Sequence, residues 1–158
     1  PRTPGRPDAR PARAARAAAP HGAARSGRVP ARAATGPGGS CIEGIGRASA
    51  EPGFLFEVVD EVVEVPDAAS IAGMRLLERY LGRRYGGSSG TNLVACLQLA
   101  QDMQRRGERG SIVSLLCDRG ERYDRTLYDP AWLAHSGIDP GPWERRLRAV
   151  AEGDGAGK

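Results

Sequence analysis

Residues 86–120 read GGSSGTNLVACLQLAQDMQRRGERGSIVSLLCDRG, and the fold prediction rests on them. They open with a polar knot of glycine and serine over 86–90 and continue into a helical pattern over about 91–106. The apolar stripe of that helix consists of Leu93, Cys96 or Leu97, Ala100 and Met103. The nearly continuous apolar run over 111–117 is typical of a strand buried on both faces of a parallel sheet.

The residues on either side extend this alternation of strands and helices. Residues 54–59 are largely apolar, and 62–65 predict a short strand that ends at a proline. Asp67 is the expected N-cap of a helix over about 68–81, and Gly82 stands at its expected C-cap. The apolar face of that helix consists of Ile71, Met74, Leu77 and Leu81. Two short helices are expected over 130–134 and 143–151, and the fold class predicted from this order is α/β.

The first 39 residues differ in kind from the rest of the chain. They hold eight Arg and one acid, a charge of 8 − 1 = +7, whereas residues 40–158 hold 15 basic and 18 acidic residues, a charge of 15 − 18 = −3. Val29 is the only large aliphatic residue among the 39, so we interpret them as a disordered tail. An arm for nucleic acid or membrane, or a transit peptide, is the functional alternative, and an out-of-frame stretch from a GC-rich gene is a third interpretation. The segment lacks aromatic residues for base stacking, which argues against nucleic acid as a partner.

Composition excludes several classes of protein and site. No run of 18 apolar residues occurs and no secretory leader is recognisable, so neither a membrane span nor export is expected. Cys41, Cys96 and Cys117 are widely spaced and odd in number, which favours reduced thiols and a cytoplasmic protein. The chain has two histidines and no Cys-x-x-Cys, so no metal site is expected. Its one lysine is Lys158, the last residue, which excludes chemistry that needs a buried lysine amine.

Ligands of α/β proteins bind beyond the carboxyl ends of the strands. Two polar segments, 87–90 and 117–120, have that position in the predicted order. The first also opens a helix, where backbone N–H groups and hydroxyls suit a polar ligand. The plainer interpretation is an ordinary helix start with glycines for a tight turn.

Three segments, 42–46, 86–92 and 116–123, occur in an order and spacing that resemble the C-terminal part of the cysteine synthase family. These are fold-type II enzymes that depend on pyridoxal 5'-phosphate (PLP), and residues 66–139 look most similar to the cysteine synthase or L-cysteine desulfhydrase branch. The resemblance covers about 40–150. It implies part of a doubly wound, mostly parallel sheet of the tryptophan-synthase-β-like fold, with residues 1–39 as a tail and 40–158 as the C-terminal part of the enzyme domain.

The resemblance also implies roles for individual residues. Ser88 matches the family's partner for the pyridine nitrogen of PLP. A neutral hydroxyl stabilises the protonated ring less than a carboxylate would, which favours β-elimination and β-replacement. The substrate-proximal segment consists of Gly44, Ile45 and Gly46. Cys117 and Asp118 depart from the Pro-Ser of many members, and we interpret Cys117 as a packed thiol rather than a nucleophile.

The family's catalytic lysine, in a Ser-x-Lys motif, has no counterpart in this sequence, and neither has its Ser/Thr-Gly-Asn substrate loop. Gly36 to Ser40 imitate the phosphate loop at the wrong spacing. No catalytic residue is therefore assigned, covalent attachment of PLP is not expected, and the chain is expected to be inactive alone. The expected function is a fragment of a PLP-dependent cysteine synthase or L-cysteine desulfhydrase, acting on a small amino acid. The alternative is a non-catalytic assembly module that pairs with a separate N-terminal half, and a homodimer is also considered.

Overall fold

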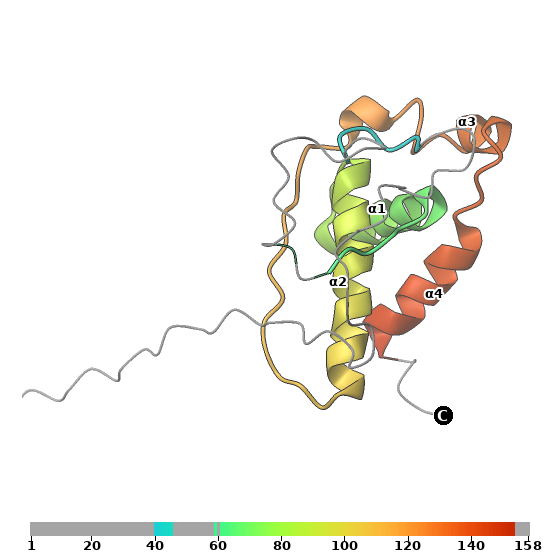
Figure 1. The fold of residues 1–158 in the computed structure, drawn as a ribbon. Helices are drawn as coiled ribbons and strands as arrows, with labels where there is room; N and C mark the ends of the chain where they lie inside the picture. The colour runs from blue at the N-terminus through green and yellow to red at the C-terminus, as the bar shows by residue number, and fades with distance from the viewer. Residues whose placement is uncertain (1–39, 46–58, 60, 154–158) are drawn as a thin grey trace, which may run out of the picture.

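A computed structural model describes residues 40–45, 59 and 61–153 (Figure 1). The elements in chain order are α1 (Asp67–Leu81), α2 (Gly87–Arg105), the 3₁₀ helix η2 (Glu121–Tyr123), α3 (Pro130–His135) and α4 (Gly141–Glu152). The predictions for the tail 1–39, for Gly46 and for most of 54–59 lie outside the described residues.

Helix α1 confirms the predicted helix but not its predicted N-cap. Pro66 occupies the N-cap, and Asp67 is already the first helical residue. The Asp67 carboxylate instead accepts hydrogen bonds from the Ser40 hydroxyl and the Cys41 N–H, both at 2.6 Å. The prediction for Asp67 was wrong because its carboxylate anchors a segment far away in the sequence. The C-cap prediction is confirmed, since Gly82 has a left-handed backbone with φ of 69°.

Helices α1 and α2 cross with their backbones in close contact at two glycines. A Cβ atom on Gly90 would lie 2.0 Å from the carbonyl oxygen of Ser70, and one on Gly73 would lie 2.5 Å from the carbonyl oxygen of Gly90. The buried Ser70 hydroxyl lies 2.7 Å from the Thr91 hydroxyl at the same crossing. Helix α2 therefore begins at Gly87, four residues before the predicted start, and the glycine-serine knot forms its first turn.

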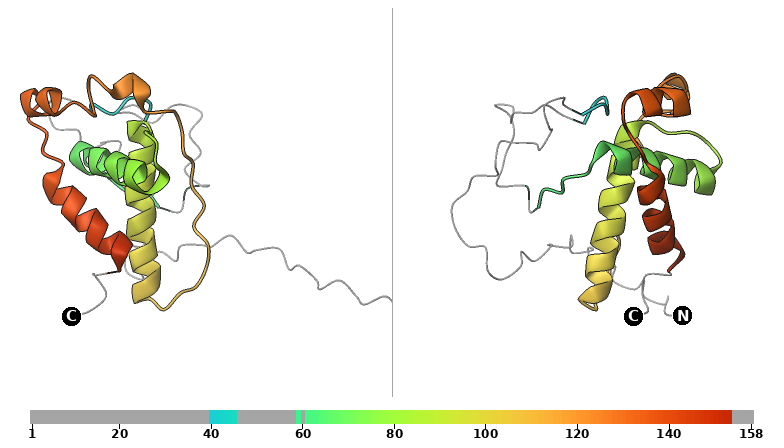
Figure 2. Two further views of the ribbon diagram at one scale, coloured as in Figure 1. Left: turned by 180° about the vertical axis from the view of Figure 1, so that it is seen from behind. Right: turned by 90° about the vertical axis from the view of Figure 1, so that its right-hand side faces the viewer.

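The core lies on two sides of α1, which packs against both α2 and α4 (Figures 1 and 2). One cluster consists of Ile42, Ile71, Met74, Tyr123, Leu127 and Leu133. The other consists of Ala69, Ala72, Leu76, Val94 and Leu147. Of the predicted apolar positions, Leu81 is 49% exposed because α1 has passed the crossing by its last turn, and Ala100 on α2 is exposed as well.

The predicted strands are absent from the described part of the chain. Residues 62–65 and 111–117 form no strand, and the one bridge recorded is an isolated antiparallel pair between Tyr85 and Arg119. The 111–117 segment returns past α2 in Figure 1 with Val113 91% and Leu115 73% exposed. A strand needs a neighbour to receive its backbone hydrogen bonds. The strand predictions were wrong here because no other extended segment of the described residues lies alongside to pair with them, and 111–117 instead runs beside helix α2.

The C-terminal helices confirm the two short helices predicted from the sequence. Asp129 caps α3, since its carboxylate accepts a hydrogen bond from the Ala131 N–H at 2.8 Å. Gly153 ends α4 with φ of 82°. None of the described helices combines the length and the apolar character that crossing a bilayer requires.

Candidate functional site

The three segments that carry the family resemblance meet at the N-terminal end of α2. A Cβ atom on Gly87 would lie 2.7 Å from Cγ2 of Ile42, so the first segment packs directly on the start of the helix. The Gly86 N–H donates to the carbonyl oxygen of Asp118 at 3.0 Å, which brings in the third segment. In Figure 1 the 40–45 loop and η2 both lie at this end of α2. Residues 40–45, 86–92 and 117–123 are therefore neighbours in the fold.

The two serines of the knot have different environments. Ser89 is fully buried, and its hydroxyl oxygen accepts a hydrogen bond from the Cys117 N–H at 2.8 Å. One turn further on, the Asn92 amide donates to the carbonyl oxygen of Leu115 at 3.0 Å. Ser89 and Asn92 thus fasten the end of the 111–117 segment to α2. Ser88 is half-buried and is the second residue of the helix.

The helix dipole gives the start of α2 partial positive charge. The first turn of α2 contains no acidic residue, and the carboxylate that faces this end, that of Asp118, lies beside the N-cap residue Gly86. A positive environment disfavours protonation of a neighbouring pyridine nitrogen. The Ser88 hydroxyl is neutral, so it can hydrogen-bond a ring nitrogen without favouring its protonation as a carboxylate would.

Asp118 organises the loop that faces this helix end. Its carboxylate accepts a hydrogen bond from the Tyr123 hydroxyl at 2.7 Å, and burial together with this bond raises the pKa of Tyr123 to about 12. A Cβ atom on Gly86 would lie 1.9 Å from Oδ1 of Asp118, so a larger residue there would displace this carboxylate. The sequence analysis left the role of Asp118 open. The signal available in the sequence was the five-residue spacing between Asp118 and Tyr123. This spacing alone did not predict their contact, because the contact depends on the turn through η2.

The three cysteines are free thiols, as predicted, but Cys117 is not packed. Cys117 is exposed, because the segment that carries it has no described neighbour on its outer side, so its interpretation as a packed thiol was wrong. Cys41 is half-buried, and burial with a hydrogen bond to Asp67 raises its pKa to about 12. Cys41 is therefore a protonated thiol at neutral pH and a poor nucleophile.

The predicted substrate-proximal segment is an exposed loop beside the start of α2. Gly44 has φ of 78°, in the left-handed region, and a Cβ there would meet nothing within 4 Å. Ile45 is 39% exposed, and Gly46 lies outside the described residues. A guanidinium N–H of Arg122 donates to Glu43 at 3.1 Å, which ties this loop to η2.

Comparison with curated proteins finds relatives for part of this chain. It is 50% identical over 104 residues to "L-cysteine desulfhydrase Cds1" of Mycobacterium tuberculosis (strain ATCC 25177 / H37Ra), covering 66% of this chain and 28% of the relative. It is 38% identical over 98 residues to an N-(2-amino-2-carboxyethyl)-L-glutamate synthase of Ralstonia nicotianae, covering 62% of this chain and 28% of the relative. The corresponding synthase of Cupriavidus metallidurans is 41% identical over 96 residues, which are 59% of this chain and 27% of the relative. The chain thus spans less than a third of the length of these relatives, and no family model matches it.

Proposed function

Because the matched part of this chain is homologous to fold-type II PLP-dependent enzymes, a family with an α/β fold, we propose that it is the C-terminal part of such an enzyme, of the L-cysteine desulfhydrase kind. The reaction it serves is the β-elimination of cysteine with water to sulfide, pyruvate and ammonia. The observation that carries the proposal is the meeting of all three motif segments at the start of α2. We place the protein in the cytoplasm.

In this proposal the start of α2 holds the ring end of the cofactor. PLP supplies the electron sink for breaking bonds at the amino-acid substrate. The Ser88 hydroxyl would hydrogen-bond the pyridine nitrogen and, being neutral, would not favour its protonation as a carboxylate would. Ser89 and Asn92 hold the 115–117 segment against the start of α2, and the loop of Gly44, Ile45 and Gly46 would lie next to the substrate.

The catalytic lysine must come from outside the described residues. The only lysine of the chain is Lys158, beyond the end of α4 and outside the described residues. The exposed apolar segment 111–117 supports pairing with a further part of the enzyme that supplies this group. The same observation supports the alternative function, a non-catalytic assembly module that docks on a separate N-terminal half or on a second copy.

A chimera tests the catalytic proposal directly. Residues 40–153 of this chain replace the matching part of the M. tuberculosis desulfhydrase, and sulfide release from cysteine is measured alongside cysteine formation from O-acetylserine and sulfide. We expect sulfide release as the dominant activity. Ser88→Ala should lower it about tenfold or more, corresponding to about 1.4 kcal/mol for a lost hydrogen bond. Ser136→Ala is the matched control, because Ser136 is exposed and follows α3.

Three outcomes contradict parts of the proposal. Robust sulfide release by the purified 158-residue chain would show that it needs no external lysine. Dominant cysteine formation by the chimera would assign β-replacement in place of β-elimination. A folded chimera without either activity would favour the assembly module.

A further inference from the structure

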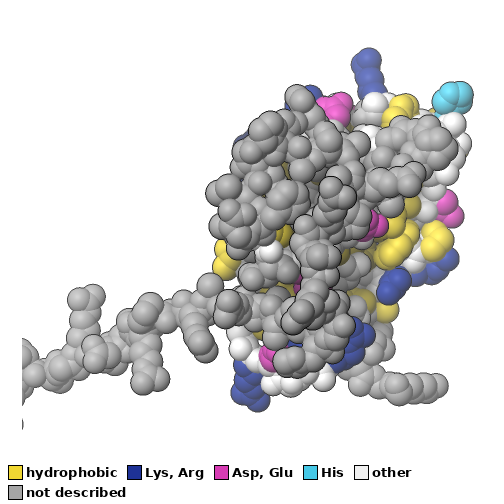
Figure 3. All heavy atoms as spheres, viewed as in Figure 1, with side chains coloured by type: hydrophobic (Ala, Val, Ile, Leu, Met, Phe, Trp, Pro, Cys, Tyr) yellow, Lys and Arg dark blue, Asp and Glu magenta, His cyan; other side chains and the backbone are white. Residues whose placement is uncertain are grey.

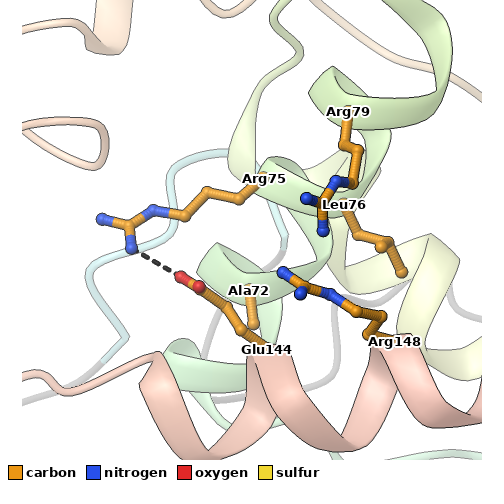
Figure 4. A pocket seen from close by; sticks show the side chains of 6 residues that line it. All are labelled: Ala72, Arg75, Leu76, Arg79, Glu144 and Arg148. Atoms are coloured by element: carbon orange, nitrogen blue, oxygen red, sulfur yellow. Dashed lines mark hydrogen bonds and ion pairs between the residues drawn. The ribbon is translucent and has the colours of Figure 1, made fainter.

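A cavity of about 110 Å³ lies between α1 and α4, apart from the residues at the start of α2 (Figure 4). Its lining residues are Ala72, Arg75, Leu76, Arg79, Glu144 and Arg148. Three guanidinium groups and one carboxylate therefore share this space, a formal charge of 3 − 1 = +2. Nothing in the proposed function uses these residues.

The one carboxylate in the cavity is already neutralised. A guanidinium N–H of Arg75 donates to Oε1 of Glu144 at 2.5 Å, and both side chains are 30% exposed. This pair joins α1 to α4 at one side of the cavity lining. The next acid along α1, Glu78, is engaged elsewhere, because it accepts a hydrogen bond from Arg84 at 2.9 Å.

Arg79 and Arg148 come from different helices, and Figure 4 shows their guanidinium groups pointing toward one another beside Leu76. Both arginines are exposed at the rim of the cavity above the buried Leu76 and Ala72, and their like charges repel there. An anion between them removes this repulsion. Guanidinium groups also offer planar sets of N–H donors that match the oxygens of phosphate and sulfate.

We propose that this cavity is a binding site for a tetrahedral oxyanion, held between Arg79 and Arg148. The ligand class is phosphate or sulfate, either free or as the phosphate of a monoester. The Arg75–Glu144 pair positions the two helices and does not hold the anion. The site is independent of PLP, so its test does not depend on the proposed function.

Titration of the full 158-residue chain with inorganic phosphate, followed by calorimetry at constant ionic strength in chloride, tests the site. We expect saturable binding of one phosphate per chain. Arg79→Gln and Arg148→Gln should each weaken it at least tenfold, whereas Arg145→Gln, on α4 but outside the cavity lining, should leave it unchanged. Glu144→Gln should not weaken binding, because Glu144 does not hold the anion and the substitution removes the one negative charge from the cavity lining.

Non-saturable heats, or an equal loss of affinity in Arg145→Gln, would overturn the proposal, since either result means general charge screening. A second arm uses glycerol phosphate. Equal affinity for the two ligands supports a site for free phosphate, and tighter binding of glycerol phosphate supports a monoester as the source. In that arm too, binding must fall in Arg79→Gln and Arg148→Gln for the site to stand.

Discussion

The Tyr123–Asp118 hydrogen bond holds the loop after the 111–117 segment against the start of α2, and it makes stability sensitive to alkaline pH. The pKa of Tyr123 is raised from 10.0 to about 12, so the unfolded chain releases this proton at lower pH than the folded chain. The contribution to stability is complete below pH 10 and is lost as the pH rises from 10 towards 12. Cys41 acts in the same direction, with its pKa raised from 9.0 to about 12.

We predict that Tyr123→Phe lowers the free energy of unfolding by about 1 kcal/mol at neutral pH, for the lost hydrogen bond. It should also make the free energy of unfolding decrease less steeply as the pH rises above 10. Urea unfolding measured from pH 7 to 11 checks both effects. Tyr80→Phe is the control, because Tyr80 is 55% exposed. An alkaline slope in Tyr123→Phe identical to that of the unsubstituted chain would contradict the assignment.

The crossing of α1 and α2 sets the position of Ser88 and Ser89, and it depends on glycine. We predict that Gly90→Ala lowers the free energy of unfolding by about 1–3 kcal/mol or more, because the new Cβ would lie 2.0 Å from the Ser70 carbonyl oxygen and 2.8 Å from the Met74 nitrogen. Alanine is the better helix former, so a net loss can come only from the contact. Thermal or urea unfolding followed by circular dichroism measures it.

Gly110→Ala is the matched control for this substitution. A Cβ there would meet only the flexible end of Met103, at 3.2 Å, and the backbone does not have positive φ. We expect a change within about 0.5 kcal/mol. If Gly90→Ala were as mild as Gly110→Ala, the helices would be able to separate at little cost, and the crossing would not position the serines.

The sequence predicted those helices whose signals are local. The apolar face through Ile71 and Met74 and the glycine at 82 located α1, and the segment that begins at Pro130 predicted α3. The start of α2 was missed because glycine and serine are typical of turns, whereas here the glycines permit contact with α1. That contact joins residues far apart in the sequence and leaves no periodic signal.

The candidate site was predictable as a set of segments but not as a set of contacts. The resemblance selected 42–46, 86–92 and 116–123, and the structure brings their described residues together. The Ser89–Cys117 and Asp118–Tyr123 hydrogen bonds were not predictable, because they depend on the path of the chain between the segments. The burial of 111–117 was predicted from its composition alone, and composition does not say whether a neighbour is present.

At the scale of the whole molecule, the apolar segment 111–117 is the feature that the described fold leaves uncovered. Val113 and Leu115 are 91% and 73% exposed, and apolar side chains reach the surface at the left margin of Figure 3, the side along which this segment runs in Figure 1. The chain spans 28% of the length of the desulfhydrase that it matches. The sequence of 111–117 has the pattern of a strand that is buried on both faces, whereas the segment is exposed here. The two observations are compatible if the remaining part of the enzyme covers this segment.

This argument predicts a specific change in amide hydrogen exchange. In the 158-residue chain alone, the N–H groups of Val113 and Leu115 should exchange rapidly, because solvent reaches this backbone. In the chimera with the remainder of the desulfhydrase, sheet hydrogen bonds should slow them by at least a hundredfold. The Cys117 N–H provides the internal control, since it donates to the buried Ser89 hydroxyl at 2.8 Å and should be protected in both proteins.

Heteronuclear NMR of amide exchange resolves these positions one by one. Unchanged exchange at Val113 and Leu115 in a folded, active chimera would show that activity does not require a strand at this position. Slow exchange in the monomeric 158-residue chain would show that other residues of the same chain cover the segment. The amides of the chain alone could also become protected only at higher protein concentration. That result would identify a second copy as the partner, because an exposed strand edge can pair with the same segment of another chain.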